Sequence, residues 1–399
     1  MNGKSIETEI TLIPNDISNT TTEKELPLKP KNKVRDSNLE LYRILTMFWI
    51  VAHHYVINSG LFSETAIFSN VFSWQSIFLL FFGAWGKTGI NCFVLITGYF
   101  MCKSNISLKK FLKLFLEFYF YQIVISAIFW IVGYAPFSLT ELVKVLIPIR
   151  NIGVGFTSNF FVFFLAIPFL NILIKNASEK QHILLILFSL GVYCFFATIP
   201  TFKVTMNYFS WFIVLYFISS YIRMYPRKIF DKTNLWLILS LISIALSIAS
   251  IFVCSWLYTK GYLSPYSFVA DCNTFLALTN GITTFLLFKN IKMKPSKFIN
   301  TVAATMFGVL CIHANSDTMR RFLWGDLFNN AGAYTSNYLP LHAILTVLIV
   351  FVVCILIDLF RIYAIEKPFF KLYDKLDGKI ANKYTKLENN LCDKYKIKR

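Results

Sequence analysis

The sequence predicts an all-α, polytopic integral membrane protein with about ten transmembrane helices and both termini in the cytoplasm. Three observations support this fold class. Hydrophobic residues make up 56% of the 399 positions and charged residues only 15%, against roughly 25% charged in soluble domains. Phenylalanine is unusually frequent, with 42 copies, and bulky apolar side chains can face lipid. The basic residues behind the net charge of +18 lie in short clusters between apolar runs, which indicates membrane topology and no nucleic-acid partner.

The chain divides by composition into three parts. Residues 1–38 are polar and are expected to form a disordered cytoplasmic tail, residues 39–363 form the membrane domain, and residues 364–399 form a basic cytoplasmic tail. Since a helical span needs about 20 apolar residues, we place spans at 39–57, 84–102, 111–134, 159–175, 182–199, 209–224, 235–258, 268–288, 301–318 and 339–363. We interpret 74–85 as an interfacial or re-entrant helix, and Pro368 as a helix stop.

Charge asymmetry supports this count of spans. With the N-terminus inside, the internal loops would hold fourteen Lys and Arg residues and the external loops six. Because basic residues accumulate in cytoplasmic loops, and the segment after Arg361 is also basic, both ends are expected inside and the number of spans is expected to be even.

The first span contains ionisable groups that need an explanation, because a charge inside an apolar span costs at least about 2.5 kcal/mol. Arg43 precedes a long apolar run that ends at His53 and His54. Arg43 and His54 are eleven residues apart, which places them near one helix face and about 16 Å apart along the axis. Arg43 either reaches anionic lipid or serves a site, and the histidines either mark the outer interface or exchange a proton with a substrate. Adjacent helical residues point about 100° apart, so His53 is not expected to share the role of His54.

The second span carries small and polar residues. Gly89 and Gly98 allow neighbouring helices to approach closely, and Asn91 places an amide inside the bilayer. These three residues either line a site or serve packing alone.

A basic run follows the second span. Lys109, Lys110 and Lys113 either mark topology or bind the phosphates of a nucleotide-bearing cofactor, and Glu117 is the expected partner of Lys113. No metal-ligand spacing is found, and the eight cysteines contain no CxxC and no expected disulfide framework.

Two further groups lie near the C-terminus. His313 ends an apolar span and is either an interface histidine or a catalytic residue. Glu366 lies near a helix C-terminus, where its charge opposes the macrodipole and calls for a positive partner, for which Arg43 is a candidate.

At these residues the sequence resembles the acyltransferase 3 family of bacterial membrane proteins. The resemblance covers almost all of residues 37–372 and is carried by four segments in order: 37–43 with Arg43 and His54, then 89–99, 307–313 and 366–369. The resemblance implies an enzyme of the bacterial cytoplasmic membrane. Such an enzyme transfers an acetyl or other short acyl group from cytoplasmic acetyl-CoA or another acyl-CoA to a hydroxyl of a cell-surface or lipid-linked polysaccharide.

The resemblance also implies roles for individual residues. His54 would be the general base or acyl-handling residue, assisted by His53 or His313, and Arg43 would belong to the donor side. Glu366 lies in the last matching segment. Lys109, Lys110 and Lys113 stand where the family has an arginine-rich element, and lysine lacks the bidentate fork of arginine. Asn91 stands where an acidic residue is common, and no proton chemistry is assigned to it. The implied partners are membrane lipid, the glycan acceptor and other glycan-assembly proteins.

Two other functions fit the same residues. A transporter or flippase for a lipid-linked sugar would line its passage with buried charges, although the sequence lacks the internal repeat common in transporters. A non-catalytic scaffold of a glycan-assembly complex is the other alternative. Release of free CoA thiol from acetyl-CoA distinguishes the enzyme from both.

Overall fold

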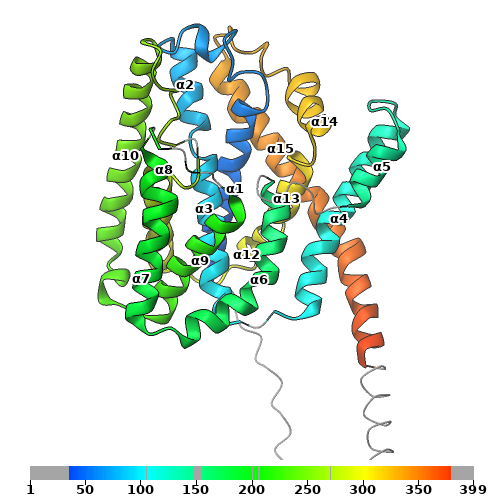
Figure 1. Ribbon diagram of the computed structural model, residues 1–399. Coiled ribbons are helices and arrows are strands. Elements are labelled where there is room, and N and C mark those ends of the chain that lie inside the picture. Colours follow the sequence, from blue (N-terminus) through cyan, green and yellow to red (C-terminus); the bar gives the residue numbers. More distant parts are fainter. Residues whose placement is uncertain are drawn as a thin grey trace, which may run out of the picture. The chain divides into compact units, whose positions relative to one another are not determined.

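The computed structural model describes residues 36–104, 106–147, 155–199, 201–202, 204, 207–269 and 271–378, and these residues form helices and turns without a strand (Figure 1). The all-α prediction is confirmed for these ranges. The longer helices are α1 Ser37–Ile57, α2 Trp74–Gly83, α3 Gly86–Met101, α4 Leu108–Ile131, α6 Phe156–Asn176, α7 Glu179–Leu190, α9 Tyr208–Met224, α10 Thr233–Tyr258, α11 Phe275–Asn290 and α15 Leu339–Arg361. The shorter ones are η1 Ile67–Ser69, α5 Leu139–Leu146, η2 Gly191–Phe195, α8 Phe196–Thr198, η3 Lys228–Asp231, α12 Lys297–Ala303, α13 Met306–His313, α14 Asp317–Arg320, η4 Arg321–Leu327 and η5 Ile362–Glu366.

Six helices in the described ranges are long and apolar enough to cross a membrane. They are Trp74–Met101, Leu108–Ile131, Phe156–Asn176, Glu179–Thr198, Thr233–Tyr258 and Leu339–Gly378, and a pair bent by 93°, Lys297–His313 with Asp317–Leu327, would make a seventh. Three predicted spans correspond to helices outside this set. α9 and α11 are only 17 and 16 residues long, and α1 contains four acidic or basic residues, which make it less apolar. The count of ten therefore stays a prediction.

The outer surface of the helices is apolar, as a lipid environment requires. On α10 the arrangement is the reverse of that in a soluble protein, since Ser240, Ser243 and Ser247 are buried while Leu237 and Leu241 are exposed. Small hydroxyl residues permit close helix approach and can bond to backbone carbonyls, and Ser247 donates to the carbonyl of Ser243 at 2.9 Å. The fold therefore places α10 with its apolar side toward lipid.

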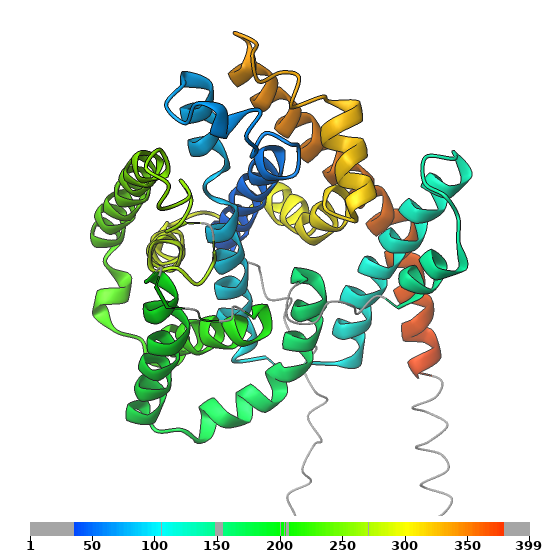
Figure 2. The same ribbon diagram turned by 45° about the horizontal axis from the view of Figure 1, so that its top comes forward.

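The helices α1 and α3 pack against each other and are surrounded by the other helices (Figure 2). α1 also contacts α2, α11, α12, α13 and α15, while α3 contacts α9 and α11. Glycines make these approaches possible. A side chain at Gly98 would overlap the hydroxyl of Ser219 on α9, and one at Gly89 would lie 2.8 Å from Ile50 on α1. The close helix packing that was predicted at Gly89 and Gly98 is thus confirmed.

Three predicted boundaries differ from the structure. The segment predicted as a separate interfacial or re-entrant helix is α2, which joins α3 in one candidate span, Trp74–Met101. The predicted span 301–318 is broken by a 93° bend after His313. The last helix continues past Pro368 to residue 378. Here the π-helical turn η5 ends at Glu366, two residues before the proline, and Lys367 donates its backbone N–H to the carbonyl of Ile362.

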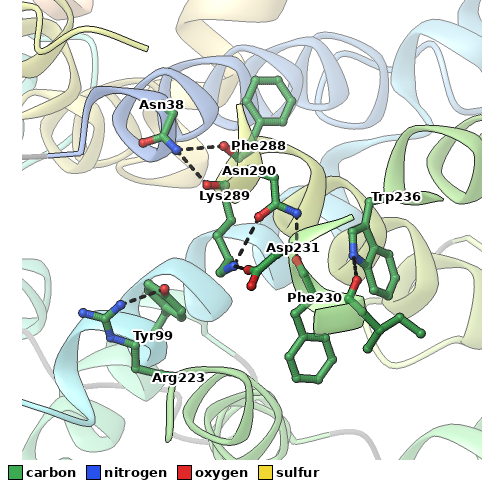
Figure 3. Close-up of polar contacts among 10 residues, drawn as sticks. Asn38, Tyr99, Arg223, Phe230, Asp231, Trp236, Phe288, Lys289 and Asn290 are labelled. Carbon is green, nitrogen blue, oxygen red and sulfur yellow. Dashed lines mark hydrogen bonds and ion pairs between the residues drawn. The ribbon is translucent and has the colours of Figure 1, made fainter. Parts of the chain in front are cut away.

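One face of the bundle, which we call the basic face, collects the start of α1 and the ends of α9 and α11 (Figure 3). Asn38 donates to the carbonyls of Phe288 and Lys289, both at 3.0 Å, and Lys289 pairs with Asp231 at 2.8 Å. Arg223 donates to the Tyr99 hydroxyl at 2.8 Å. The start of α4 lies near the end of the last helix, since Lys109 pairs with Asp374 at 2.5 Å.

Replacing Gly98 tests the close packing of α3 on α9. We expect Gly98→Ala to lower stability in detergent by about 1–3 kcal/mol, the usual cost of overpacking, and the double variant Gly98→Ala/Ser219→Gly to recover most of it. Gly191→Ala is the matched control, because no neighbouring atom lies within 4 Å of the added carbon. Equal melting temperatures for Gly98→Ala and Gly191→Ala would contradict the packing described.

Candidate functional site

Two histidines far apart in the sequence meet in the interior. His54 lies near the end of α1 and His313 at the end of α13, and their rings are joined by a 2.9 Å contact between Nδ1 of His54 and Nε2 of His313. His313 is fully buried, whereas His54 is partly accessible. The bend after α13 places His313 at a helix end, where its ring reaches α1. We call these two residues the histidine pair.

The hydrogen bonds define which ring nitrogens of the histidine pair carry a proton. Nδ1 of His313 lies 2.6 Å from the carbonyl oxygen of Val309, and a carbonyl can only accept, so this nitrogen carries the proton. In a neutral ring, Nε2 of His313 then accepts a hydrogen bond from Nδ1–H of His54. This leaves Nε2 of His54 with a lone pair. Nε2 of His54 can thus accept a proton.

His53 has a different environment from His54. Its Nδ1 donates to the carbonyl of Gly83 at 2.6 Å, and its ring fills the space beside Gly86, where a side chain would overlap it. His53 therefore anchors α1 to the junction of α2 and α3. The two neighbouring rings are tilted by 48° with centroids 5.8 Å apart.

Two cations that the sequence analysis did not assign to the site lie in elements next to the histidine pair. Lys87, the second residue of α3, follows Gly86, which the ring of His53 contacts, and it donates to the hydroxyl of Tyr208 at 2.9 Å. Arg320 lies on α14, the short helix that follows the bend after His313. The sequence does contain a signal that could have identified Lys87 as a site residue, since it is a lysine inside the apolar segment that contains Gly89 and Asn91. Arg320 could not be placed near His54 without knowledge of the bend after α13.

A second polar cluster, which we call the arginine cluster, is centred on Arg361 at the end of α15. Its guanidinium pairs with Asp358 at 2.6 Å, Glu366 at 2.8 Å and Glu117 at 3.0 Å, and Arg361 and its three acidic partners are at most 8% exposed. Tyr121 donates to Asp358 at 2.8 Å. The cluster joins α4 to α15 and η5.

The arginine cluster corrects two predicted pairings. Glu366 pairs with Arg361 and, at 2.7 Å, with Lys113, whereas Arg43 pairs with Glu40 at 3.1 Å. Glu117, the expected partner of Lys113, pairs with Arg361 instead. Glu40 lies one helical turn before Arg43, so the local ion pair forms within α1 and needs no contact with the last helix.

The remaining predicted residues lie in three places. Arg43 is 22% exposed on α1, with its guanidinium 5.9 Å from the ring centre of Phe93. Lys109 pairs with Asp374, and Lys110 donates to Ser104 at 2.8 Å. Asn91 donates to the carbonyl of Cys272 at 2.6 Å and accepts from Trp211 at 2.8 Å, so its amide joins α3 to two other parts of the chain. In the described ranges, no group of three or more His, Cys, Asp or Glu residues is arranged to hold a metal.

Fold and site together define a helical membrane protein with a hydrogen-bonded histidine pair in its interior. The acyltransferase 3 family model, described as an acyltransferase domain, matches residues 36–359, and the chain belongs to this family. No curated protein and no solved structure matches the chain. The matched range includes both members of the histidine pair, and it ends just before Arg361.

Removal of the central arginine tests the arginine cluster. We expect Arg361→Gln to destabilise the protein by about 3–5 kcal/mol, because three buried carboxylates lose their shared partner. Melting in detergent measures the change. Arg227→Gln is the control, since Arg227 forms an exposed ion pair with Glu179, and such pairs contribute about 0–1 kcal/mol. Similar losses in the two variants would contradict the buried role of Arg361.

Proposed function

We propose that this membrane acyltransferase transfers an acetyl or other short acyl group from cytoplasmic acyl-CoA to a hydroxyl of a cell-surface or lipid-linked polysaccharide. The observation that carries the proposal is the histidine pair, whose hydrogen bonds leave Nε2 of His54 free to accept a proton. The membership of the chain in an acyltransferase family supports the reaction type. Acetyl-CoA is the proposed donor, and no metal is required by this chemistry.

The proposed reaction uses His54 as base and then as acid. Nε2 of His54 removes the proton of the acceptor hydroxyl while the oxygen attacks the thioester carbonyl. The tetrahedral intermediate collapses, the carbon–sulfur bond breaks, and the CoA thiolate takes the proton back from His54. The products are an ester and free CoA thiol. His313 accepts the Nδ1–H bond of His54 throughout and supports the imidazolium that forms between the two steps.

The proposed topology has ten spans with both termini in the cytoplasm of a bacterial cell, and it places the basic face toward the donor. Polar contacts support this placement of the two termini. Asn38 at the start of α1 bonds to the end of α11, which contains Lys289, and Asp374 in the last helix pairs with Lys109 of α4. Arg43 belongs to the α1 segment on this side, and Arg223 has the Tyr99 hydroxyl as its partner. Both arginines can offer forked N–H donors to the nucleotide phosphates. Lys109 and Lys113 already pair with carboxylates, so their proposed contribution to donor binding is smaller.

Histidine variants test the proposed chemistry. We expect His54→Ala to lower kcat by at least about 100-fold, the lower limit for loss of general acid–base catalysis. His313→Gln should retain more activity than His313→Ala, because the amide oxygen can still accept the Nδ1–H bond. Release of CoA thiol, together with the mass of the glycan product, measures the reaction.

His182→Gln is the control for these variants. His182 is also fully buried, but it bonds to the carbonyl of Phe217 at 3.0 Å, away from the histidine pair. The kcat of the His182→Gln variant should match that of the wild type. Wild-type rates in His54→Ala would refute the assignment, and a wild-type protein that never releases CoA thiol would favour a transporter or a scaffold.

An arginine variant tests the donor side. We expect Arg43→Gln to raise the KM for acetyl-CoA by about tenfold or more, the effect of losing a charged hydrogen bond, without a change in the KM for the acceptor. Lys144→Gln is the control, because Lys144 forms an exposed pair with Glu141 at 2.5 Å, beyond the other end of α4. An unchanged donor KM in a folded Arg43→Gln protein would remove Arg43 from the donor site.

A further inference from the structure

A polar pocket of about 400 Å³ opens at the face opposite the basic face. It lies between the end of α1 and the helical turns α14 and η4, which are found at the top of Figure 1. This volume is within the range of roughly 300–1,000 Å³ typical of ligand sites. Its lining contains Asn58, Ser59, Gly60, Asp317, Arg320, Arg321 and Gly325.

The pocket is connected to the histidine pair through both of its walls. In one wall, Asn58 caps α1 and donates its backbone N–H to the carbonyl of His54 at 3.1 Å. In the other wall, α14 begins four residues after His313, and Asp317 and Arg320 of α14 line the pocket. A ligand held here therefore lies beside the end of α1 that carries His54.

The lining of the pocket has an excess of positive charge. Arg320 pairs with Asp317 at 2.7 Å, which neutralises one of the two arginines. Arg321 bonds through Nε to the hydroxyl of Tyr134 at 3.3 Å, and this hydroxyl in turn donates to Asp326. The two terminal nitrogens of Arg321 form a fork that suits the oxygens of a phosphate or carboxylate. Asn58 and Ser59 add an amide and a hydroxyl, which are groups that bond to sugar hydroxyls.

From this lining we infer that the pocket binds an anionic carbohydrate, that is, a sugar bearing a phosphate or a carboxylate, as the acceptor of the acyl group. The inference rests on the proposed function and specifies its acceptor. Arg321, with Arg320, holds the anionic group, and Asn58 and Ser59 contact the sugar ring. The free hydroxyl of the sugar is then directed toward Nε2 of His54.

Binding to a protein that carries His54→Ala tests the inference without any chemistry. Glucose 1-phosphate, glucuronate, glucose and inorganic phosphate are titrated by calorimetry against this protein in detergent. We expect glucose 1-phosphate or glucuronate to bind at least tenfold more tightly than glucose and than phosphate. Adding Arg321→Gln should weaken that binding by tenfold or more, and Arg321→Lys, which keeps the charge without the fork, should weaken it less.

The control for this titration is Arg227→Gln, an exposed arginine that pairs with Glu179. It should leave binding unchanged, and melting curves verify that every variant is folded. The inference is overturned if neither anionic sugar binds, if phosphate alone binds equally well, or if folded Arg321→Gln and Arg320→Gln both bind with unchanged affinity. The proposed function is judged separately by CoA release from the wild type.

Discussion

The main physical constraint on this protein is that each polar group in an apolar interior must find its partner on the protein itself. Unpaired polar and charged groups lose their hydration inside a bilayer and are costly there. The arginine cluster satisfies this constraint by joining Arg361 to carboxylates from α4, α15 and η5. Such contacts connect helices that have little other reason to associate, because lipid is as apolar as their side chains.

The position of the catalytic candidate follows from the same constraint. A side chain at Gly308 would overlap the carboxyl group of Asp358, so α13 lies directly against the arginine cluster. His313 is five residues further along α13, and its ring bonds to Val309 of the same helix and to His54 of α1. The arginine cluster therefore supports the helix that holds one half of the histidine pair. The arginine cluster and the histidine pair therefore belong to neighbouring parts of one helical framework.

The two ends of α1 have different environments. Near its start, Arg43 pairs with Glu40 and lies on the ring of Phe93, close to the basic face. Near its other end, one helical turn after His54, Asn58 lines a pocket that also contains two arginines. Under the proposed function, this division keeps the nucleotide-bearing donor and the carbohydrate acceptor at opposite faces. The thioester and the hydroxyl would then meet at His54.

The sequence by itself determined the all-α fold class, the ionisable residues that stand out within apolar runs, and the acyltransferase class of the reaction. Apolar runs predict helices because backbone groups in lipid must bond within their own segment, and Arg43, His54 and His313 stood out because ionisable groups in such runs are costly. Along one helix, spacing also predicted correctly that His53 would point away from His54.

Only the tertiary structure decided the partners. Glu366 was paired with Arg43 from their expected depth in the membrane, whereas it meets Arg361 and Lys113. Likewise, the bond between His54 and His313 joins residues 259 positions apart and depends on a bend that apolar composition does not reveal. The physical reason is that periodicity fixes which face of a helix is polar, while the identity of the facing helix depends on packing, glycine contacts and the breaks between helices.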